Sequence, residues 1–288
     1  MKYYSLNKYL RCQFGDKVYK ISLDAGFTCP NRDGTIDTRG CIFCSKGGSG
    51  DFAESRKMTI TQQIEAGKKR VQNKIKSGKY IAYFQAFTNT YAPIGELKEK
   101  FYEAIKHKDI VAISIATRPD CLGKDVIELL DALNKIKPVF IELGLQTIHE
   151  KSAEYIRRGY KLEVYDQAVA QLRKIGVNIV VHIIIGLPGE TKQDMLKTVN
   201  YVCKSGIDGI KLQLLHILKN TDLEKEYLAG KVKPLAFEEY LDIIKDCVNI
   251  IPEHIVIHRL TGDGAKKDLI APLWSADKKR VINAINKL

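Results

Sequence analysis

Short runs of β-branched and aliphatic residues alternate in this sequence with longer stretches in which apolar residues recur about every 3.6 positions. Six such runs precede a loop or a helical stretch, at residues 18–23, 80–87, 110–116, 139–145, 178–185 and 209–216. This alternation is typical of βα units whose strands form a parallel sheet. We therefore predict an α/β fold that is a partial (β/α)6 TIM-like barrel with small N- and C-terminal extensions.

The expected barrel occupies residues 18–220, after an N-terminal extension at 1–17 and before a C-terminal extension at 221–288 that closes it. The longest apolar run, 179–187, is interrupted by His182 and is far shorter than the roughly 20 residues of a membrane span. The first residues also lack the apolar segment of a signal peptide. We expect no membrane association and a cytoplasmic location, where clustered cysteines favour metal binding over disulfides.

Three cysteines lie in the long loop after the first predicted strand. Eleven residues separate Cys29 from Cys41, and two separate Cys41 from Cys44. Loops at the carboxyl ends of barrel strands carry reactive groups. Thiolates bind zinc or iron–sulfur clusters, but structural zinc normally takes four protein ligands, and no fourth ligand is near in the sequence. Three cysteines instead suit a 4Fe–4S cluster with one open iron.

The order of strand, three-cysteine loop and βα repeats resembles the radical S-adenosylmethionine (radical SAM) superfamily. Here eleven residues stand where that superfamily most often has three between its first two cysteines. The pairs Cys29-Pro30 and Gly40-Cys41 resemble the branch of Elongator-type and coproporphyrinogen dehydrogenase-type enzymes. Segments 24–32, 84–91 and 259–264 resemble the YhcC/YtqA family, and the likeness spans essentially the whole chain.

This resemblance implies a cofactor set and an activity. Cys29, Cys41 and Cys44 would hold a 4Fe–4S cluster, and the open iron would bind S-adenosylmethionine. Reductive cleavage of S-adenosylmethionine to a 5′-deoxyadenosyl radical would need an electron donor such as flavodoxin or ferredoxin. The sequence does not determine the oligomeric state.

Polar residues after the second predicted strand are candidates for the methionyl amine. Relatives often carry a Gly-Gly-Glu segment there, whereas this chain has Gln85, Thr88 and Asn89 and no carboxylate. Each side-chain oxygen could accept a hydrogen bond from the amine. The alternative for all three is an ordinary polar loop.

The end of the fourth predicted strand resembles the Glu-Leu-Gly-Val-Gln-Ser segment of the same branch. Glu142 and Gln146 are four residues apart, so an extended strand presents them on one face. Gln146 resembles a ribose contact. Glu142 could meet the cofactor or could be a core carboxylate with its own partners.

Two arginines and one turn complete the predicted cofactor site. Segment 156–160 resembles one whose arginine pairs with the methionyl carboxylate, for which we prefer Arg158 and keep Arg118 as a second candidate. The turn that begins at Gly186 resembles the adenine-binding turn of the superfamily. We expect Gln85, Gln146, Arg158 and Gly186 to surround one cavity with the cysteine loop.

The sequence offers fewer candidates for substrate contacts than for cofactor contacts. His216, at the end of the sixth predicted strand, is our candidate catalytic residue, and His182 is a second histidine that could face the substrate. Either could instead be a packed core histidine. Family resemblance adds His258 and Arg259, which would lie at the barrel mouth.

The charge balance is compatible with an anionic partner. Forty-six Lys and Arg against 34 Asp and Glu give a formal net charge of +12. The YhcC/YtqA resemblance implies action on tRNA, with remodelling of a carboxymethylaminomethyl group of the wobble uridine towards aminomethyl. Two alternatives stay open: radical oxidation of a tetrapyrrole, and a non-enzymatic RNA-binding module stabilised by zinc.

Overall fold

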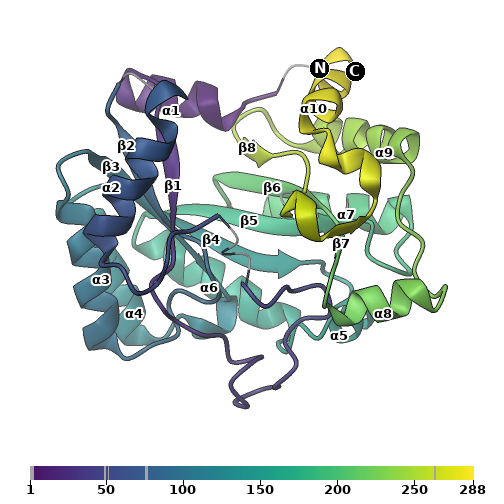
Figure 1. The fold of residues 1–288 in the computed structure, drawn as a ribbon, viewed down its shortest axis with the longest axis horizontal. Helices are drawn as coiled ribbons and strands as arrows, with labels where there is room; N and C mark the ends of the chain where they lie inside the picture. Colours follow the sequence, from purple (N-terminus) through teal and green to yellow (C-terminus); the bar gives the residue numbers. More distant parts are fainter. Residues whose placement is uncertain (1–2, 49, 51, 75–76, 263) are drawn as a thin grey trace.

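A computed structural model describes residues 3–48, 50, 52–74, 77–262 and 264–288. Its centre is a parallel sheet with strand order β1-β2-β3-β4-β5-β6-β8. The sheet curls, and β1 and β8 are its two separate edges (Figure 1). The seven strands are Tyr19–Leu23, Tyr80–Phe84, Ile110–Thr117, Val139–Gln146, Asn178–Ile185, Gly209–Leu214 and Val256–Arg259. This confirms the predicted α/β partial barrel.

The structure adds to the predicted strands and shortens some of them. A seventh strand, β8, comes from the stretch that we placed in the C-terminal extension, and it pairs in parallel with β6. Strand β2 ends at Phe84, three residues before the predicted end, and the chain then turns through Phe87, whose φ of 61° ends extended structure. A short antiparallel pair, β7 (Ile217–Leu218) with β9 (Leu269–Ala271), follows β6.

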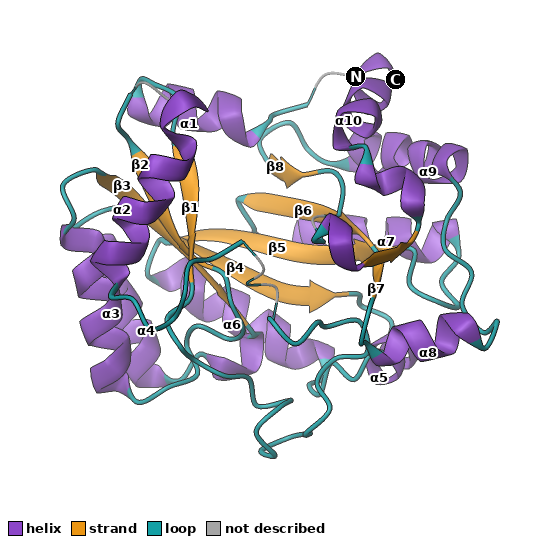
Figure 2. Cartoon of the chain, viewed as in Figure 1, coloured by secondary structure: helices purple, strands orange, loops and turns teal. Residues whose placement is uncertain are grey.

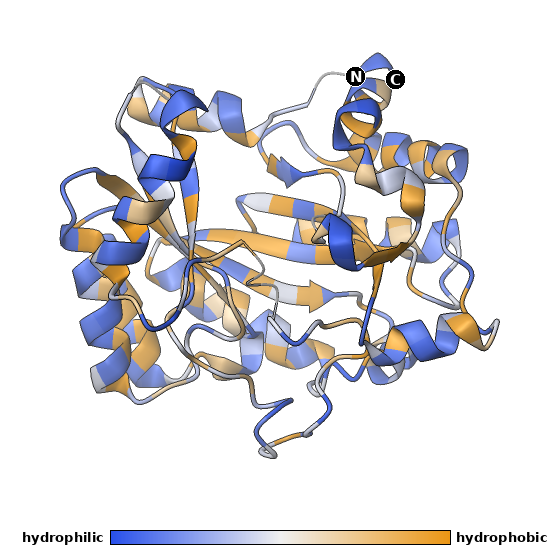
Figure 3. Cartoon of the chain, in the orientation of Figure 1, coloured by the Kyte–Doolittle hydropathy of each residue, from blue (hydrophilic) through white to orange (hydrophobic). Residues whose placement is uncertain are grey.

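Helices cover the outer face of the sheet, with their hydrophilic sides outward (Figures 2 and 3). Their apolar sides pack on the strands: Ile64, Phe101, Leu130, Leu172 and Val199 all have no exposed surface. The outer helices are α2 (Ile60–Val71), α3 (Ile94–Lys106), α4 (Lys124–Asn134), α6 (Leu162–Lys174), α7 (Lys192–Lys204) and α9 (Phe237–Ile250). None of the described helices is both long and apolar enough to span a membrane.

The amino-terminal end of the barrel is closed by α1 (Leu6–Phe14). Leu10 on α1 belongs to a buried cluster with Ile81, Ala112, Phe140 and Val180, which lie near the starts of β2 to β5. Apolar packing therefore fills this end of the barrel, and polar groups and space gather at the carboxyl end.

The remaining elements are shorter than the six outer helices. Val281 and Ile285 anchor the last helix, α10, in the main core. These elements are α5 (Glu150–Tyr155), α8 (Asp222–Leu228), α10 (Lys278–Lys287) and the 3-10 turns Gln72–Lys74, Pro119–Cys121, Lys266–Asp268 and Leu273–Ala276.

Candidate active site

A cavity of about 250 Å³ opens at the carboxyl ends of the strands. Its walls come from the cysteine loop, from strands β2 to β6 and from β8. Most residues predicted to form the site line it: Cys29, Cys41, Cys44, Gln85, Arg118, Glu142, Gln146, Arg158, His182, His216 and Arg259. Residues from sequence positions far apart thus meet at one place.

The cysteine loop is held in shape by two polar neighbours of Cys29. The Arg32 guanidinium donates to the Cys44 carbonyl oxygen at 3.0 Å. Asn31 Nδ2 donates to the Arg157 carbonyl at 2.6 Å and lies 3.5 Å from Cys41 Sγ. These hydrogen bonds fix a segment that has no regular secondary structure of its own.

The three cysteines fit an iron–sulfur cluster better than a single zinc ion. None of the three forms a disulfide, and all three are half-buried on the cavity wall. Tetrahedral zinc with Zn–S bonds of about 2.3 Å brings its sulfurs within about 3.8 Å of one another. Among the described residues, the sulfurs of Cys29, Cys41 and Cys44 do not all lie within 4.8 Å of one another. Three thiolates that are not clustered closely enough for zinc, with no fourth His, Cys, Asp or Glu grouped with them among the described residues, suit a group that contains several iron atoms.

Gln146 lines the cavity and has an unusual backbone conformation. Its φ of 72° is unusual for a residue other than glycine, and it lies where the register between β4 and β5 shifts. Gln146 Oε1 is buried and has no hydrogen-bond partner within the described part of the chain. Buried polar atoms are nearly always paired, so this oxygen fits a bound donor such as a ribose hydroxyl.

The two candidate arginines, Arg118 and Arg158, differ in how many of their N–H donors already make hydrogen bonds within the protein. Arg158 uses three of its N–H groups on the Tyr160 carbonyl, the Thr147 carbonyl and Glu150 Oε1, at 2.9, 2.7 and 3.1 Å. Arg118 uses two, both on the Asp120 carboxylate. A guanidinium has five such donors. Both arginines line the cavity, and Arg118 has more donors left for a carboxylate than Arg158 has.

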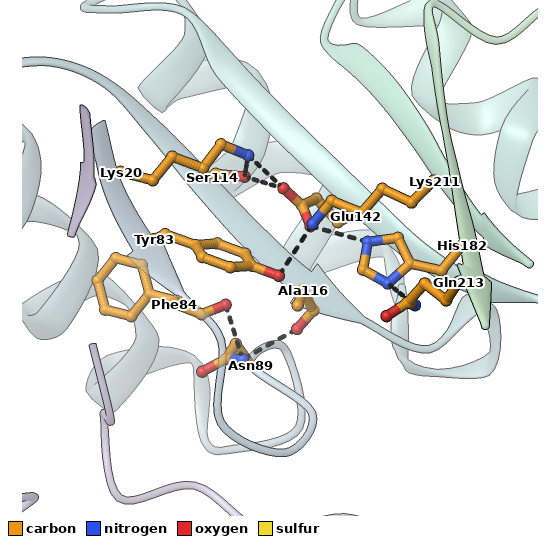
Figure 4. Close-up of polar contacts among 10 residues, drawn as sticks. All are labelled: Lys20, Tyr83, Phe84, Asn89, Ser114, Ala116, Glu142, His182, Lys211 and Gln213. Atoms are coloured by element: carbon orange, nitrogen blue, oxygen red, sulfur yellow. Dashed lines mark hydrogen bonds and ion pairs between the residues drawn. The ribbon is translucent and has the colours of Figure 1, made fainter. Parts of the chain in front are cut away.

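Four predicted residues are not among those that line this cavity. Asn89 Nδ2 donates to the Phe84 and Ala116 carbonyls, at 3.1 and 3.0 Å, and so ties the ends of β2 and β3 together (Figure 4). Thr88 is 2% exposed beside it. Thr88 and Asn89 therefore match the alternative of an ordinary polar loop that connects two strands.

The other two residues outside the cavity lining are Gly186 and His258. The Gly186 amide donates to Met195 Sδ at 3.3 Å, and a Cβ at this position would meet Leu235, outside the cavity. His258 lies deeper in the barrel, edge-to-face with Phe140, and burial lowers its pKa well below the ordinary value. Its Nδ1 has no partner among the described residues.

The inner wall of the cavity carries a buried charge network, shown in Figure 4. Glu142 Oε1 accepts from Lys20 Nζ at 2.6 Å and from Ser114 Oγ at 2.7 Å. Glu142 Oε2 accepts from His182 Nε2 at 2.8 Å and from Lys211 Nζ. We call these five residues the Glu142 network. Four donors saturate the carboxylate, so Glu142 matches the core-carboxylate alternative.

Lys211 is a member of this network that the sequence analysis missed. It is 4% exposed and donates to Tyr83 Oη at 3.2 Å. Burial, together with Lys20 and Arg259, lowers the pKa of Lys211 to about 7 against the opposing effect of Glu142. A lone lysine inside an apolar strand was the available signal, because such a residue is rarely buried without a functional or electrostatic reason.

Both candidate histidines on the cavity wall are neutral at physiological pH. Burial and Lys211 lower the pKa of His182 to about 4, so its Nε2 donates to Glu142 as a neutral imidazole. Burial also lowers the pKa of His216 to about 4, and its Nδ1 accepts from the Gly264 amide at 3.3 Å. His216 Nε2 is buried without a partner in the described chain. Asp263, in the same segment, lies outside the described residues.

Comparison with known proteins identifies the family. Residues 37–202 match the radical SAM superfamily, and residues 207–288 match the radical SAM C-terminal domain. YtqA of Bacillus subtilis is 48% identical over 286 residues, which cover 99% of this chain and 89% of YtqA. YhcC of Escherichia coli is 36% identical over 267 residues, which cover 92% of this chain and 85% of YhcC.

Two more distant proteins share part of the sequence or the fold. A tRNA uridine(34) acetyltransferase of Methanocaldococcus jannaschii is 29% identical over 172 residues, which cover 58% of this chain and 31% of that protein. The structure of Elp3 from Methanocaldococcus infernus superposes with a TM-score of 0.70 at 18% identity, covering 94% of this chain and 63% of Elp3. The chain therefore belongs to the radical SAM superfamily of enzymes, which use a 4Fe–4S cluster and S-adenosylmethionine, and within it to the YhcC/YtqA family.

Proposed function

We propose that this enzyme acts on tRNA and remodels a carboxymethylaminomethyl group on carbon 5 of the wobble uridine towards aminomethyl. One observation carries the proposal: a single cavity joins the three cysteines to an inner wall that contains Lys211 and Arg259. Glu142 is the only acidic residue among the described residues of this wall, and its oxygens are already bonded. Such a site suits a substrate group that carries a carboxylate.

The cavity favours a protruding side chain over a whole tetrapyrrole. S-adenosylmethionine and the reacting group of the substrate must share its volume of about 250 Å³, so a substrate that inserts one side chain needs less of this space than a whole tetrapyrrole. A modified base in a single-stranded anticodon loop can extend its side chain into such a space without opening a duplex. The net charge of +12 is compatible with a polyanion that stays outside the cavity.

In this proposal, each group of cavity residues has a separate role. Cys29, Cys41 and Cys44 would hold the cluster, Gln146 would accept from a ribose hydroxyl, and Arg118 would meet the methionyl carboxylate. When bound, the cluster and S-adenosylmethionine would supply the radical that removes a hydrogen atom from the methylene beside the nitrogen. Loss of one further electron, back to the oxidised cluster, and addition of water would then break the C–N bond and release the two-carbon unit as glyoxylate, leaving the aminomethyl group. Apolar side chains on the cavity wall, Phe43, Phe87, Ile156 and Ile184, would keep water away from it.

The relatives give further support. The acetyltransferase that matches this chain over 172 residues is named for uridine 34 of tRNA, and the Elp3 structure shares its fold. Their names alone do not fix the modification, which the experiment below tests directly.

The test follows wobble nucleosides by mass spectrometry. Enzyme reconstituted anaerobically with its cluster is incubated with reductant, S-adenosylmethionine and tRNA from a deletion strain. We expect the carboxymethylaminomethyl nucleoside to decrease and the aminomethyl nucleoside to increase, with a Cys44→Ala variant as the inactive control. Unchanged nucleosides in both the strain and the reaction, while S-adenosylmethionine is still cleaved, would rule out this substrate and favour the tetrapyrrole alternative. A colourless protein that contains zinc would instead favour the RNA-binding module.

A further inference from the structure

Asn31 is a completely buried residue beside one of the three cysteines. It has no exposed surface, and its Nδ2 lies 3.5 Å from Cys41 Sγ. The same nitrogen donates to the Arg157 carbonyl at 2.6 Å and lies 3.4 Å from the Arg158 carbonyl. The backbone carbonyl of Asn31 accepts from the Gly40 amide at 2.7 Å. Both the side chain and the backbone of Asn31 are therefore tied to the segment that carries Cys41.

The neighbours of Asn31 determine which way its amide group points. The Arg157 and Arg158 carbonyls can only accept hydrogen bonds, so the atom of Asn31 that faces them must be the NH2 nitrogen. The opposite orientation would place Asn31 Oδ1 against two carbonyl oxygens. Because Cys41 Sγ is a neighbour of the same nitrogen, the sulfur faces an N–H donor.

One N–H of Asn31 is left for Cys41 after the other has bonded to the Arg157 carbonyl. The Arg158 carbonyl, at 3.4 Å, is beyond the usual range of about 2.7–3.2 Å for an N–H···O bond. Sulfur is a larger atom than oxygen, so 3.5 Å is within the reach of an N–H···S bond. A thiolate is also charged, and hydrogen bonds to charged acceptors are roughly twice as strong as neutral ones.

Cluster binding would increase the importance of this donor. As a thiol, Cys41 donates to the Arg157 carbonyl, with Sγ and the oxygen 3.7 Å apart. A cysteine that binds metal is a thiolate and has no hydrogen to donate. Sγ and the carbonyl oxygen would then be two neighbouring acceptors, and the NH2 group of Asn31 donates to both.

The Arg157 carbonyl is held in place by the backbone and by α8. Arg157 has a φ of 58°, which is uncommon for a residue other than glycine, and its guanidinium donates to Asp222 Oδ2 at 2.6 Å. The cysteine loop is bonded on both sides here, because the Ile42 amide donates to the Ile156 carbonyl and the Ile42 carbonyl accepts from the Leu223 amide. The fold therefore fixes the acceptor to which the buried amide group donates.

We propose that Asn31 is a positioning residue that raises the reduction potential of the cluster through an N–H···S hydrogen bond to Cys41. Hydrogen bonds to the sulfurs are among the factors that set the potentials of iron–sulfur clusters. Uptake of one electron from the external donor increases the negative charge on the cluster and its sulfurs, so this bond stabilises the reduced form more than the oxidised form. The inference requires Cys41 to be a cluster ligand, and it does not depend on the identity of the substrate.

Asn89 offers a matched control for Asn31. It is equally buried, and its Nδ2 also donates to two backbone carbonyls, at 3.1 and 3.0 Å. The Oδ1 atoms of both residues lack a partner among the described residues. Neither acceptor of Asn89 is a sulfur, so Asn89→Ala removes a comparable set of structural hydrogen bonds without removing a donor to a cysteine.

The test measures the reduction potential of the reconstituted cluster in the wild type, in Asn31→Ala and in Asn89→Ala. An anaerobic redox titration without S-adenosylmethionine or tRNA follows the reduced cluster by electron paramagnetic resonance, and iron and sulfide analysis gives the occupancy. At a fixed ambient potential, the ratio of reduced to oxidised cluster should fall about 10-fold in Asn31→Ala, which is about 59 mV for one electron. Asn89→Ala should match the wild type.

A second measurement uses the wild type and does not depend on how well the variants fold. Enzyme labelled with nitrogen-15 only in the side-chain amides of asparagine should show a nitrogen-15 hyperfine coupling to the reduced cluster in pulsed spectra, because the hydrogen bond carries spin density to the donor nitrogen. The coupling should disappear in Asn31→Ala and persist in Asn89→Ala.

Three results would overturn the inference. They are the absence of this coupling in the wild type, an unchanged potential in fully occupied Asn31→Ala, and an equal shift in both variants, which would indicate a general loosening of the site. If Asn31→Ala fails to hold a cluster, the wild-type coupling decides, since its presence supports the hydrogen bond and its absence rules it out. Neither measurement uses tRNA, so failure to convert tRNA would disprove the proposed function and leave these results unchanged.

Discussion

The side chain of Gln146 folds back over Gly144, and Gln146 Nε2 lies 3.0 Å from the position that a Cβ on Gly144 would occupy. A Gly144→Ala substitution would therefore displace this amide, whose Oε1 is buried without a hydrogen-bond partner among the described residues. We expect the affinity for S-adenosylmethionine to fall about 10-fold, the effect of losing roughly one hydrogen bond. Equilibrium dialysis with reconstituted enzyme measures this.

The control for that prediction is Gly95→Ala. Gly95 lies in α3, and a Cβ there meets no other atom within 4 Å. Its affinity for S-adenosylmethionine should match that of the wild type. Equal affinities for all three proteins would show that Gln146 does not contact the cofactor.

Replacing Cys29, Cys41 or Cys44 by Ala should abolish iron–sulfur incorporation, because each change removes one of three thiolate ligands. Cys203→Ala is the matched control, since Cys203 is also a half-buried free thiol but lies on α7, away from the cavity. Iron and sulfide analysis after anaerobic reconstitution gives the occupancy. Full occupancy in one of the three variants would remove that cysteine from the ligand set.

The Glu142 network should contribute strongly to stability. Glu142→Gln leaves the buried Lys211 and the partly buried Lys20 without their carboxylate, and we expect the free energy of unfolding to fall by about 3–5 kcal/mol. Ser114→Ala, which removes one hydrogen bond to the same oxygen, should lower it by only about 1 kcal/mol. Urea unfolding measures both changes. Similar small losses would mean that the two lysines find other partners.

The pH dependence of that difference follows from the pKa of Glu142. Burial raises this pKa, but Lys20, Lys211 and His182 together hold it well below the ordinary value. The carboxylate therefore stabilises the fold above its unfolded pKa of about 4.3, and this contribution is lost as the pH falls towards the folded pKa. The gap between wild type and Glu142→Gln should be largest near neutral pH and should narrow below about pH 4. A constant gap would contradict the assignment.

Much of the fold followed from local pattern, because each of the six apolar runs became a strand and the cysteine loop lies where a barrel places its functional loops. What the sequence could not reveal depends on register. Nothing local shows that Lys20, Glu142 and Lys211 meet, since they come from β1, β4 and β6. The partners of Arg158 could not be predicted for a similar reason, because its donors are used by carbonyls and a carboxylate that only the folded chain brings near.

Affinity for tRNA should fall steeply as the salt concentration rises if Lys and Arg side chains of the protein bind phosphates of the tRNA. Each phosphate neutralised contributes about 0.7 to 0.9 to the slope of log K against log salt. Filter binding between 50 and 300 mM salt gives the slope for full-length tRNA and for a nucleoside alone. We expect a slope of several units for tRNA and close to zero for the nucleoside. Equal, shallow slopes would indicate that a small molecule is the substrate.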